Sequence, residues 1–277
     1  MTVATLEQVL RPCLGDGTAI AGVVVLGWED AQAYVMAAEA EGRPVILQAG
    51  PGCRAHTPLP VLGAMLRHLA EGASIPVVAH LDHGENLDVC RAAIDHGFTS
   101  VMYDGSALPF VENVSNTAKI VDIGHRAGVS VEAELGYVGY ADGAVSQGTD
   151  PAMVARFAAE TAIDALAVSV GNVHLMTGTG TVIDFGLLRR IAADAPDLPL
   201  VLHGGSGIAP DLRRRLARQT TVCKFNIGTE LRQAFGSALR QAVLAQPDRF
   251  DRIQILKETV PPLVLVARRV IAGLARD

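Results

Sequence analysis

Three histidines of the sequence come at or just after the ends of apolar runs. His83 and His174 follow such runs by three and four residues, and His203 is the last residue of a third run. Imidazole nitrogens are preferred zinc ligands, and a catalytic zinc site uses three protein ligands while keeping one position open for substrate. The three side chains can bind one ion if these run ends meet in the fold. The other histidines of loops and helices are interpreted as surface or packing residues: His56, His68, His96 and His125.

A carboxylate lies next to the first of these histidines. Asp82 precedes His83, and neighbouring residues on a regular strand point to opposite faces. Both can enter one site only where the strand is ending, and Gly84 makes such a departure possible. Asp82 could then exchange a proton with a hydroxyl group held at the metal. Alternatively, it caps the next helix or orients an imidazole, and the sequence leaves both interpretations open.

Eight short apolar runs alternate with amphipathic segments of helical period. The runs are Ala21–Leu26, Pro44–Gln48, Ile75–His80, Ser100–Tyr103, Val129–Leu135, Ala165–Val170, Leu198–His203 and Val222–Ile227. The segments between them include Pro58–Glu71, Asn86–His96, Asn113–Ala127, Pro151–Ala162 and Phe185–Ala193. Apolar runs without alternation are typical of parallel strands covered on both faces. Eight strand–helix units in one series predict a closed (β/α)8 TIM barrel, an α/β fold.

The expected barrel forms a single domain over residues 1–277, because no linker or low-complexity tract divides the chain. Two extra helices are expected at its C-terminal end, over Thr229–Ala245 and Arg249–Ala275. Reactive groups of such barrels lie at the carboxyl ends of the strands. The three histidines follow three different strands, so they are expected at one rim, where they can converge on one zinc ion.

Two loops at the same rim have the composition of an anion site. Gly204–Gly207 follows the seventh run, and Asn226–Thr229 comes at the end of the eighth. These are the usual phosphate-binding positions of the barrel, where backbone amides and small hydroxyl groups surround the anion. Most glycine-rich loops are only turns, so the position in the barrel carries this prediction.

Composition narrows the class of protein and of partner. The chain has 277 residues, of which 49% are hydrophobic and 19% charged, and this favours a folded protein with a large core. A net charge of -6 gives no basic surface for nucleic acid or an acidic membrane, so a small molecule is the expected partner. Four scattered cysteines, no signal peptide and no membrane-spanning run predict reduced thiols and a cytoplasmic location.

Several longer segments resemble one enzyme family. They are HLDHG (80–84), GFTSVMYDGSALPFVENV (97–114), GVSVEAELG (128–136), DALAVSVGNVH (164–174), LVLHGGSG (200–207) and KFNIGTELRQAF (224–235). In this order they resemble the class II, zinc-dependent ketose-bisphosphate aldolases. The tagatose 1,6-bisphosphate aldolases are the closer branch, and the fructose 1,6-bisphosphate aldolases the other. The likeness runs from about Pro44 to Arg232.

The resemblance implies roles for particular residues. His83, His174 and His203 would bind one catalytic Zn²⁺, with Asp82 as proton donor in cleavage. Two carboxylates, Asp104 and Glu134, match a second or alternative metal position. Asp142 stands where the family has a glutamate in the mobile loop after strand five, which makes it a second catalytic candidate. The implied substrate contacts are Leu175, Gly204, Gly205, Ser206, Asn226, Ile227, Gly228 and Thr229.

The implied reaction is reversible retro-aldol cleavage of a ketose or ketose phosphate between carbons three and four. It would pass through a zinc-stabilised enediolate and give dihydroxyacetone, or its phosphate, and an aldehyde. The route needs no Schiff-base lysine, so Lys224 on the eighth run need not be catalytic. The family also implies a homodimer or homotetramer.

The sequence departs from the family pattern near the expected substrate. Leu175 stands where members have glycine, and Gly178 stands where they have a lysine that helps to hold phosphate. Provided that no other cation replaces this lysine, discrimination in favour of phosphate should weaken by about 10- to 150-fold. We therefore expect a substrate altered from fructose or tagatose bisphosphate, and good use of free dihydroxyacetone or another donor.

Two other functions are consistent with the same residues. A metal-dependent sugar epimerase or isomerase would reprotonate the enediolate without breaking the carbon–carbon bond, and product analysis separates it from an aldolase. A non-catalytic sugar-phosphate-binding protein would keep the barrel and bind ligand without turnover. The presence of Asp82 and of all three histidines argues against this last function.

Overall fold

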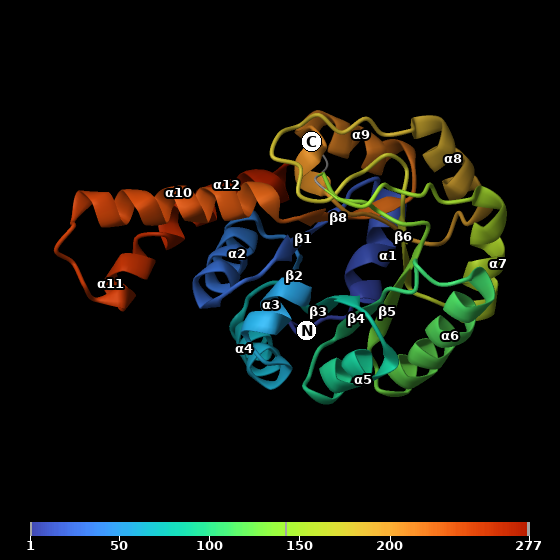
Figure 1. Cartoon of the computed structure of the whole chain (residues 1–277), viewed down its shortest axis with the longest axis horizontal. Coiled ribbons are helices and arrows are strands. Elements are labelled where there is room, and N and C mark those ends of the chain that lie inside the picture. Colours follow the sequence, from blue (N-terminus) through green and yellow to red (C-terminus); the bar gives the residue numbers. More distant parts are fainter. Residues whose placement is uncertain (1, 142, 276–277) are drawn as a thin grey trace.

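The eight strands close into one parallel barrel in chain order, as predicted. The structure is a computed structural model that describes residues 2–141 and 143–275. Its strands are β1 (Ile20–Val24), β2 (Val45–Ala49), β3 (Val77–Gly84), β4 (Ser100–Tyr103), β5 (Ser130–Leu135), β6 (Ala165–Val168), β7 (Leu200–Leu202) and β8 (Val222–Ile227). The last strand pairs with the first, which closes the ring and confirms the (β/α)8 fold (Figure 1).

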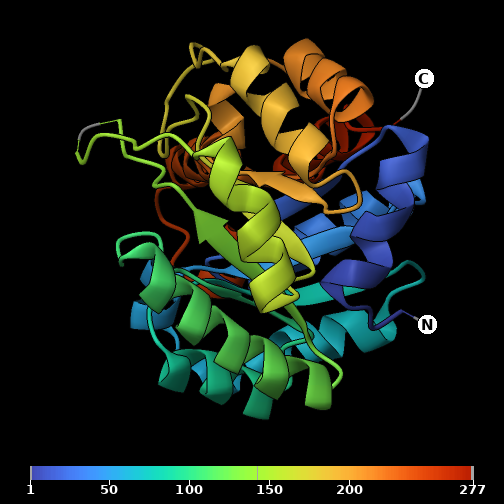
Figure 2. The same ribbon diagram turned by 90° about the vertical axis from the view of Figure 1, so that its right-hand side faces the viewer.

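Most helices of the chain surround this barrel on its outer side (Figure 2). The helices are α1 (Leu6–Asp16), α2 (Trp28–Glu41), α3 (Pro51–His56), α4 (Leu59–Gly72), α5 (Leu87–Asp95), α6 (Phe110–Arg126), α7 (Pro151–Thr161), α8 (Phe185–Asp194), α9 (Pro210–Gln219), α10 (Thr229–Ala245), α11 (Arg252–Lys257) and α12 (Val260–Ala272). Helix α1 instead lies at one end of the barrel, and α11 lies in an arm that projects from it (Figure 1). The continuous helical stretch expected over Arg249–Ala275 is wrong, because α11 and α12 are separate helices. Pro261 and Pro262 explain the break, since proline fits the first turn of a helix but not its interior.

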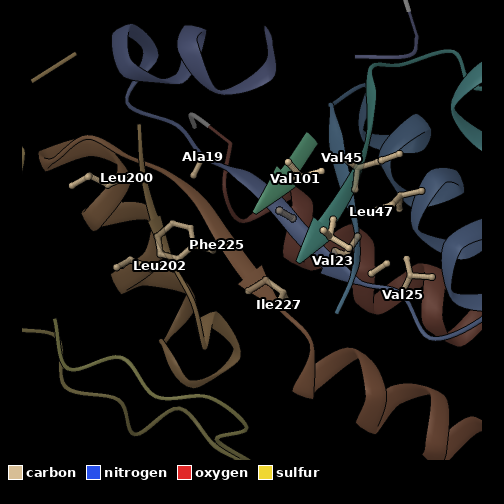
Figure 3. Packing of buried hydrophobic residues seen from close by; sticks show 14 of the residues in the cluster. Ala19, Val23, Val25, Val45, Leu47, Val101, Leu200, Leu202, Phe225 and Ile227 are labelled. Carbon is tan, nitrogen blue, oxygen red and sulfur yellow. The ribbon is translucent and has the colours of Figure 1, made fainter. Parts of the chain in front are cut away.

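Strand side chains alternate between the barrel interior and the ring of helices. The outward set is apolar and fully buried beneath the helices, as Figure 3 shows for Val23, Val45, Leu47, Val101, Leu200, Leu202, Phe225 and Ile227. Both faces of each strand are therefore covered, and this is why the runs lack polar residues on the outward side.

The interior of the barrel is divided into an apolar and a polar part. Helix α1 lies across one end of the barrel, where its apolar side chains pack with inward residues of the strands (Figure 1). The buried polar side chains lie further along the strands, toward their carboxyl ends, and they include Gln48, His80, Asp82, Glu132, Glu134, His203, Lys224 and Asn226. The polar side chains that could take part in a reaction thus lie near the carboxyl rim, and α1 covers the opposite end of the barrel.

The C-terminal helices form an arm that projects from the barrel (Figure 1). Helix α12 packs against α2 and α10, and α11 lies at the far end of the arm. Apolar side chains near this end are exposed, among them Leu244 (77%), Phe250 (96%) and Ile253 (65%). None of the described helices is both long and apolar enough to cross a membrane. The four cysteines are buried and unpaired with one another.

Candidate active site and metal centre

The three predicted histidines meet at the carboxyl rim. His83 belongs to β3, His174 to the loop after β6, and His203 follows β7 directly. Their ring centroids lie 4.7 to 5.4 Å apart. The Nε2 atoms of His83 and His174 and the Nδ1 atom of His203 are buried without a hydrogen-bond partner, and ligand atoms of the three residues lie within 4.8 Å of one another. Since buried polar atoms are rarely left unpaired, this cluster fits a metal ion.

The charges around the three rings also fit a cation. Burial lowers the pKa of His174 to about 4 and the pKa of His203 well below its usual range, so both rings are neutral and carry a free lone pair. Burial lowers the pKa of His83 as well, but Asp82 and a hydrogen bond with Asp104 outweigh burial and raise that pKa to about 9. The carboxylates thus favour positive charge at His83, which either a proton or a metal ion supplies.

Asp104 and Glu134 lie beside the histidines. The Nδ1 atom of His83 is 2.7 Å from Asp104 Oδ2, and the Asp104 carboxylate also accepts a hydrogen bond from the Ser106 hydroxyl. Glu134 Oε2 is buried without a partner, 3.7 Å from His203 Nδ1. Ligand atoms of His83, Asp104 and Glu134 form a second group within 4.8 Å. Both groups include His83, so they describe alternative positions for an ion that share one ligand.

An irregularity in β3 brings Asp82 and His83 into the same cavity. The strand continues to Gly84 with a β-bulge, in which Asp82 and His83 lie opposite the single residue Met102 of β4. His83 has a φ of 50°, in the left-handed region. The departure from strand geometry therefore occurs at His83, and Gly84 is not the residue with the unusual φ. Both Asp82 and His83 line the cavity.

Asp82 does not cap the helix that follows it. Helix α5 is capped by Asn86, and Asp104 is the carboxylate that contacts the His83 ring. Asp82 Oδ1 instead accepts a hydrogen bond of 3.2 Å from the side-chain amide of Asn226. Burial alone would raise the pKa of Asp82. The neighbouring imidazoles, above all His83, lower this pKa by more than burial raises it, so the net pKa is below its usual value. An ionised carboxylate thus lies beside the metal cluster.

A cavity of about 270 Å³ opens at this cluster, and most of the predicted contact residues line it. They are Asp82, His83, His174, Leu175, Gly204, Ser206, Asn226, Gly228 and Thr229. Of the predicted substrate contacts, Gly205 and Ile227 do not line it, and neither do the predicted metal ligands His203, Asp104 and Glu134. Gly205 packs against β8, where a Cβ atom would lie 2.9 Å from the carbonyl oxygen of Asn226, and the Ile227 side chain belongs to the apolar core. The predicted catalytic residue Asp142 lies outside the described residues.

Three features of the cavity were not predicted from the sequence. The segment Gly50–Cys53 after β2, which is the start of α3, forms one wall. Tyr140 stacks on His174 with ring centroids 4.9 Å apart. Arg232, in the first turns of α10, is the one arginine or lysine among the described residues that line the cavity. The sequence did contain an indication of Arg232, because it places an arginine in the first turn of a predicted helix. A positive charge there is unfavourable next to the helix dipole unless an anion binds nearby.

The two departures from the family pattern lie in different surroundings. Leu175 lines the cavity and is half exposed. Its φ of 59° is unfavourable for any residue with a Cβ atom, and glycine adopts it more easily. Its conformation explains why a glycine would be expected at this position. Gly178 is exposed and does not line the cavity. The position of the missing lysine therefore lies on the outer part of this loop.

Lys224 lies deeper inside the barrel than the three histidines, among fully buried polar side chains. Its ammonium is 2.6 Å from Glu132 Oε2 and 3.3 Å from His80 Nε2. The other oxygen of Glu132 is 3.2 Å from His203 Nε2. Glu132 thus joins the lysine to a candidate metal ligand, as carboxylates commonly do for zinc-bound histidines. This environment gives Lys224 a structural role.

A closed parallel barrel with imidazoles and carboxylates at the carboxyl ends of its strands has the architecture of a metal-dependent barrel enzyme. The model of the class-II fructose-bisphosphate aldolase family matches residues 4–274. The chain belongs to this family and is a class II aldolase, a lyase that breaks a carbon–carbon bond of a sugar substrate. The predicted family, fold and enzyme class are thereby confirmed.

Similar proteins share this assignment. The chain is 38% identical to a fructose-bisphosphate aldolase of Streptococcus pyogenes over 249 residues, which cover 87% of this chain and 84% of the relative. It is 37% identical to the fructose-bisphosphate aldolase of Geobacillus stearothermophilus, in a match that covers 92% of this chain and 91% of the relative. The crystal structure of the YdjI aldolase from Escherichia coli K12 is 31% identical, with a TM-score of 0.84 and 98% and 97% of the two chains covered.

Proposed function

We propose that the chain is a zinc-dependent aldolase that cleaves a ketose or ketose phosphate reversibly between carbons three and four. The products would be dihydroxyacetone, or its phosphate, and an aldehyde. The observation that supports this most strongly is the set of three buried, unpaired ring nitrogens of His83, His174 and His203, beside a cavity that the carboxylate of Asp82 lines. The names of the S. pyogenes and G. stearothermophilus relatives support a ketose phosphate as substrate.

His83, His174 and His203 are the residues that would hold the ion, and Asp104 with Glu134 would provide an alternative position around His83. When bound, zinc would withdraw electron density from the ketone carbonyl of the substrate. Imidazole ligands favour zinc over calcium or magnesium, which prefer oxygen ligands. The first group therefore supports zinc, whereas the second, with two carboxylates, also suits harder cations.

We propose that Asp82 handles the proton of the hydroxyl group on carbon four. In cleavage the bond between carbons three and four breaks, its electron pair stays on carbon three, and the hydroxyl proton must leave. Asp82 is ionised, so it accepts this proton in cleavage and returns it in condensation. It is thus a proton donor in condensation, the reverse of the direction expected from the sequence. Carbon three then needs a proton, and Asp142 remains the sequence-based candidate for its donor.

We propose that Arg232 binds an anionic group of the donor substrate. Its guanidinium is exposed at the cavity and forms no ion pair within the described part of the chain. Nearby, the Ser206 hydroxyl accepts hydrogen bonds of 3.3 Å from the amides of Gly228 and Glu230, which joins the two anion loops. Arginine binds phosphate through two parallel hydrogen bonds. Arg232 would thus replace the lysine that is absent at Gly178.

We therefore predict that Arg232→Gln reduces the preference for dihydroxyacetone phosphate over dihydroxyacetone. The ratio of their kcat/KM values in condensation should fall by about 10- to 150-fold, because a charge-assisted hydrogen bond contributes roughly 1.5 to 3 kcal/mol. Arg240→Gln, on the same helix but outside the cavity, is the control and should leave the ratio unchanged. An unchanged ratio in Arg232→Gln would remove Arg232 from the site and leave the expectation of a donor without phosphate.

The proposed reaction is tested by the identity of the products. Ketoses and ketose phosphates, with zinc added, should give a three-carbon donor and an aldehyde. A product that is only an epimer or isomer of the starting sugar would favour the isomerase alternative. Binding of the sugar phosphate without any product would favour the binding-protein alternative.

We further propose a homodimer or homotetramer in the cytoplasm. The exposed apolar side chains Leu244, Phe250 and Ile253 lie near the end of the projecting arm. Exposed apolar patches commonly mark protein interfaces, so the arm is the part of the surface that best supports self-association. Four free, buried cysteines fit a reducing compartment.

A further inference from the structure

A buried arginine contacts the irregular end of β3. Arg54 lies on α3, shortly after β2, and its side chain is only 8% exposed. Its Nη1 donates to the carbonyl oxygens of Ala49 at 3.0 Å and Asp82 at 2.6 Å, and its Nη2 donates to the carbonyl oxygen of His83 at 2.9 Å. The remaining partner is the Glu85 carboxylate, 2.7 Å from Nη2.

These carbonyl groups lie where β3 has lost its regular partners. Strand β2 ends at Ala49, which is paired with Leu81, so Asp82 and His83 extend beyond it. On the other side the bulge interrupts the pairing with β4. Buried carbonyl groups need donors, and the left-handed φ of His83 is itself unfavourable. The guanidinium of Arg54 therefore supplies the hydrogen bonds that a neighbouring strand supplies elsewhere in the barrel.

We propose that Arg54 is a positioning residue for catalysis, which sets the directions of the Asp82 and His83 side chains. On a regular strand these neighbours would point to opposite faces, and the bulge is what turns both toward the cavity. The rigid guanidinium fork fixes both peptide groups relative to the end of β2. Arg54 does not line the cavity, so it acts through these two residues, whose roles rest on the proposed function.

The ion pair with Glu85 does not account for the burial of Arg54. The Glu85 side chain is 62% exposed, and exposed ion pairs contribute little to stability. Glu85→Gln is therefore a matched control, because it removes the ion pair and leaves the three carbonyl contacts in place. Arg54→Met removes all four interactions while keeping most of the apolar stem, and Arg54→Lys keeps the charge without the fork.

The experiment compares zinc affinity, measured by competition with a chelator, the absorption spectrum of the cobalt-substituted protein, and kcat. Arg54→Met should bind zinc about 10- to 100-fold more weakly and show an altered cobalt spectrum. Its kcat should fall on the order of 100-fold, because misplacement of reacting groups by about 1 Å has that effect. Arg54→Lys should lose about 10-fold in zinc affinity, near the lower end of the same range. Glu85→Gln should match the unaltered protein in all three measurements.

Unchanged zinc affinity and an unchanged cobalt spectrum in folded Arg54→Met would overturn the inference. If Arg54→Met does not fold, Arg54→Lys decides the question by the same two measurements. A loss of stability alone would leave the cobalt spectrum of the folded protein unaltered, so the spectrum separates positioning from general support. Zinc affinity and spectrum do not depend on turnover. They therefore test Arg54 even if no ketose is cleaved, a result that would count against the proposed function instead.

Discussion

Replacement of Asp82 by asparagine is expected to remove most of the activity while metal binding persists. The amide keeps the shape of the carboxylate and can still accept the hydrogen bond from Asn226, but it cannot take up the proton of the substrate hydroxyl. We expect kcat to fall on the order of 100-fold or more, as general acid–base roles contribute roughly 100- to 10,000-fold. Steady-state cleavage at saturating zinc, together with the zinc content of the protein, is the measurement.

The control for this variant is Asp88→Asn, an exposed carboxylate on the following helix. It should keep full activity. The Asp82→Asn protein could instead lose zinc on purification and yet show a normal rate when zinc is added to saturation. That result would show that Asp82 supports the metal ligands. In that case the proton must be moved by another group.

Lys224→Met is expected to lower the free energy of unfolding by about 3 to 5 kcal/mol. Lys224 and Glu132 are fully buried and 2.6 Å apart, so removal of the ammonium leaves a carboxylate uncompensated inside the barrel. Urea denaturation of the metal-free protein measures the change, since bound zinc would add its own stabilisation.

The double variant Lys224→Met with Glu132→Gln separates charge from shape. It removes both charges, and the glutamine side chain can still contact His203 Nε2, as Glu132 does at 3.2 Å. We expect it to recover most of the lost stability, because replacing both members of a buried ion pair is often nearly neutral. If Lys224→Met is as stable as the unaltered protein, the ion pair between Lys224 and Glu132 does not stabilise the barrel, and the description of these buried polar side chains is wrong.

The positions of the main reactive residues follow from strand periodicity. Glu132 and Glu134 are two residues apart on β5, so both point into the barrel, and the same alternation brings His203 inward at the end of β7. The carboxyl-end rule for barrels then places the three histidines at one rim. Helix α2, in contrast, was not among the segments named from the sequence, because its many alanines are buried on several sides and leave a weak helical period.

Other parts of the site carry no pattern in the sequence. The β-bulge depends on the left-handed φ of His83. A glycine at this position would have indicated such a conformation, but a histidine does not. Arg54 was not predicted because it binds backbone carbonyl groups, which every residue has. Gly205 and Ile227 were expected at the substrate, yet they face β8 and the core. Their loops lie at the rim as predicted, but the loop conformation decides which residues reach the cavity.

We expect His83, His174 and His203 to hold one catalytic metal ion. Crystals of the protein prepared with one equivalent of zinc per chain, with diffraction measured on both sides of the zinc absorption edge, test it most directly. We expect a single anomalous peak that lies about 2.0 to 2.1 Å from Nε2 of His83, Nε2 of His174 and Nδ1 of His203. A peak elsewhere, with the nitrogens of His174 and His203 left unbound, would contradict this expectation.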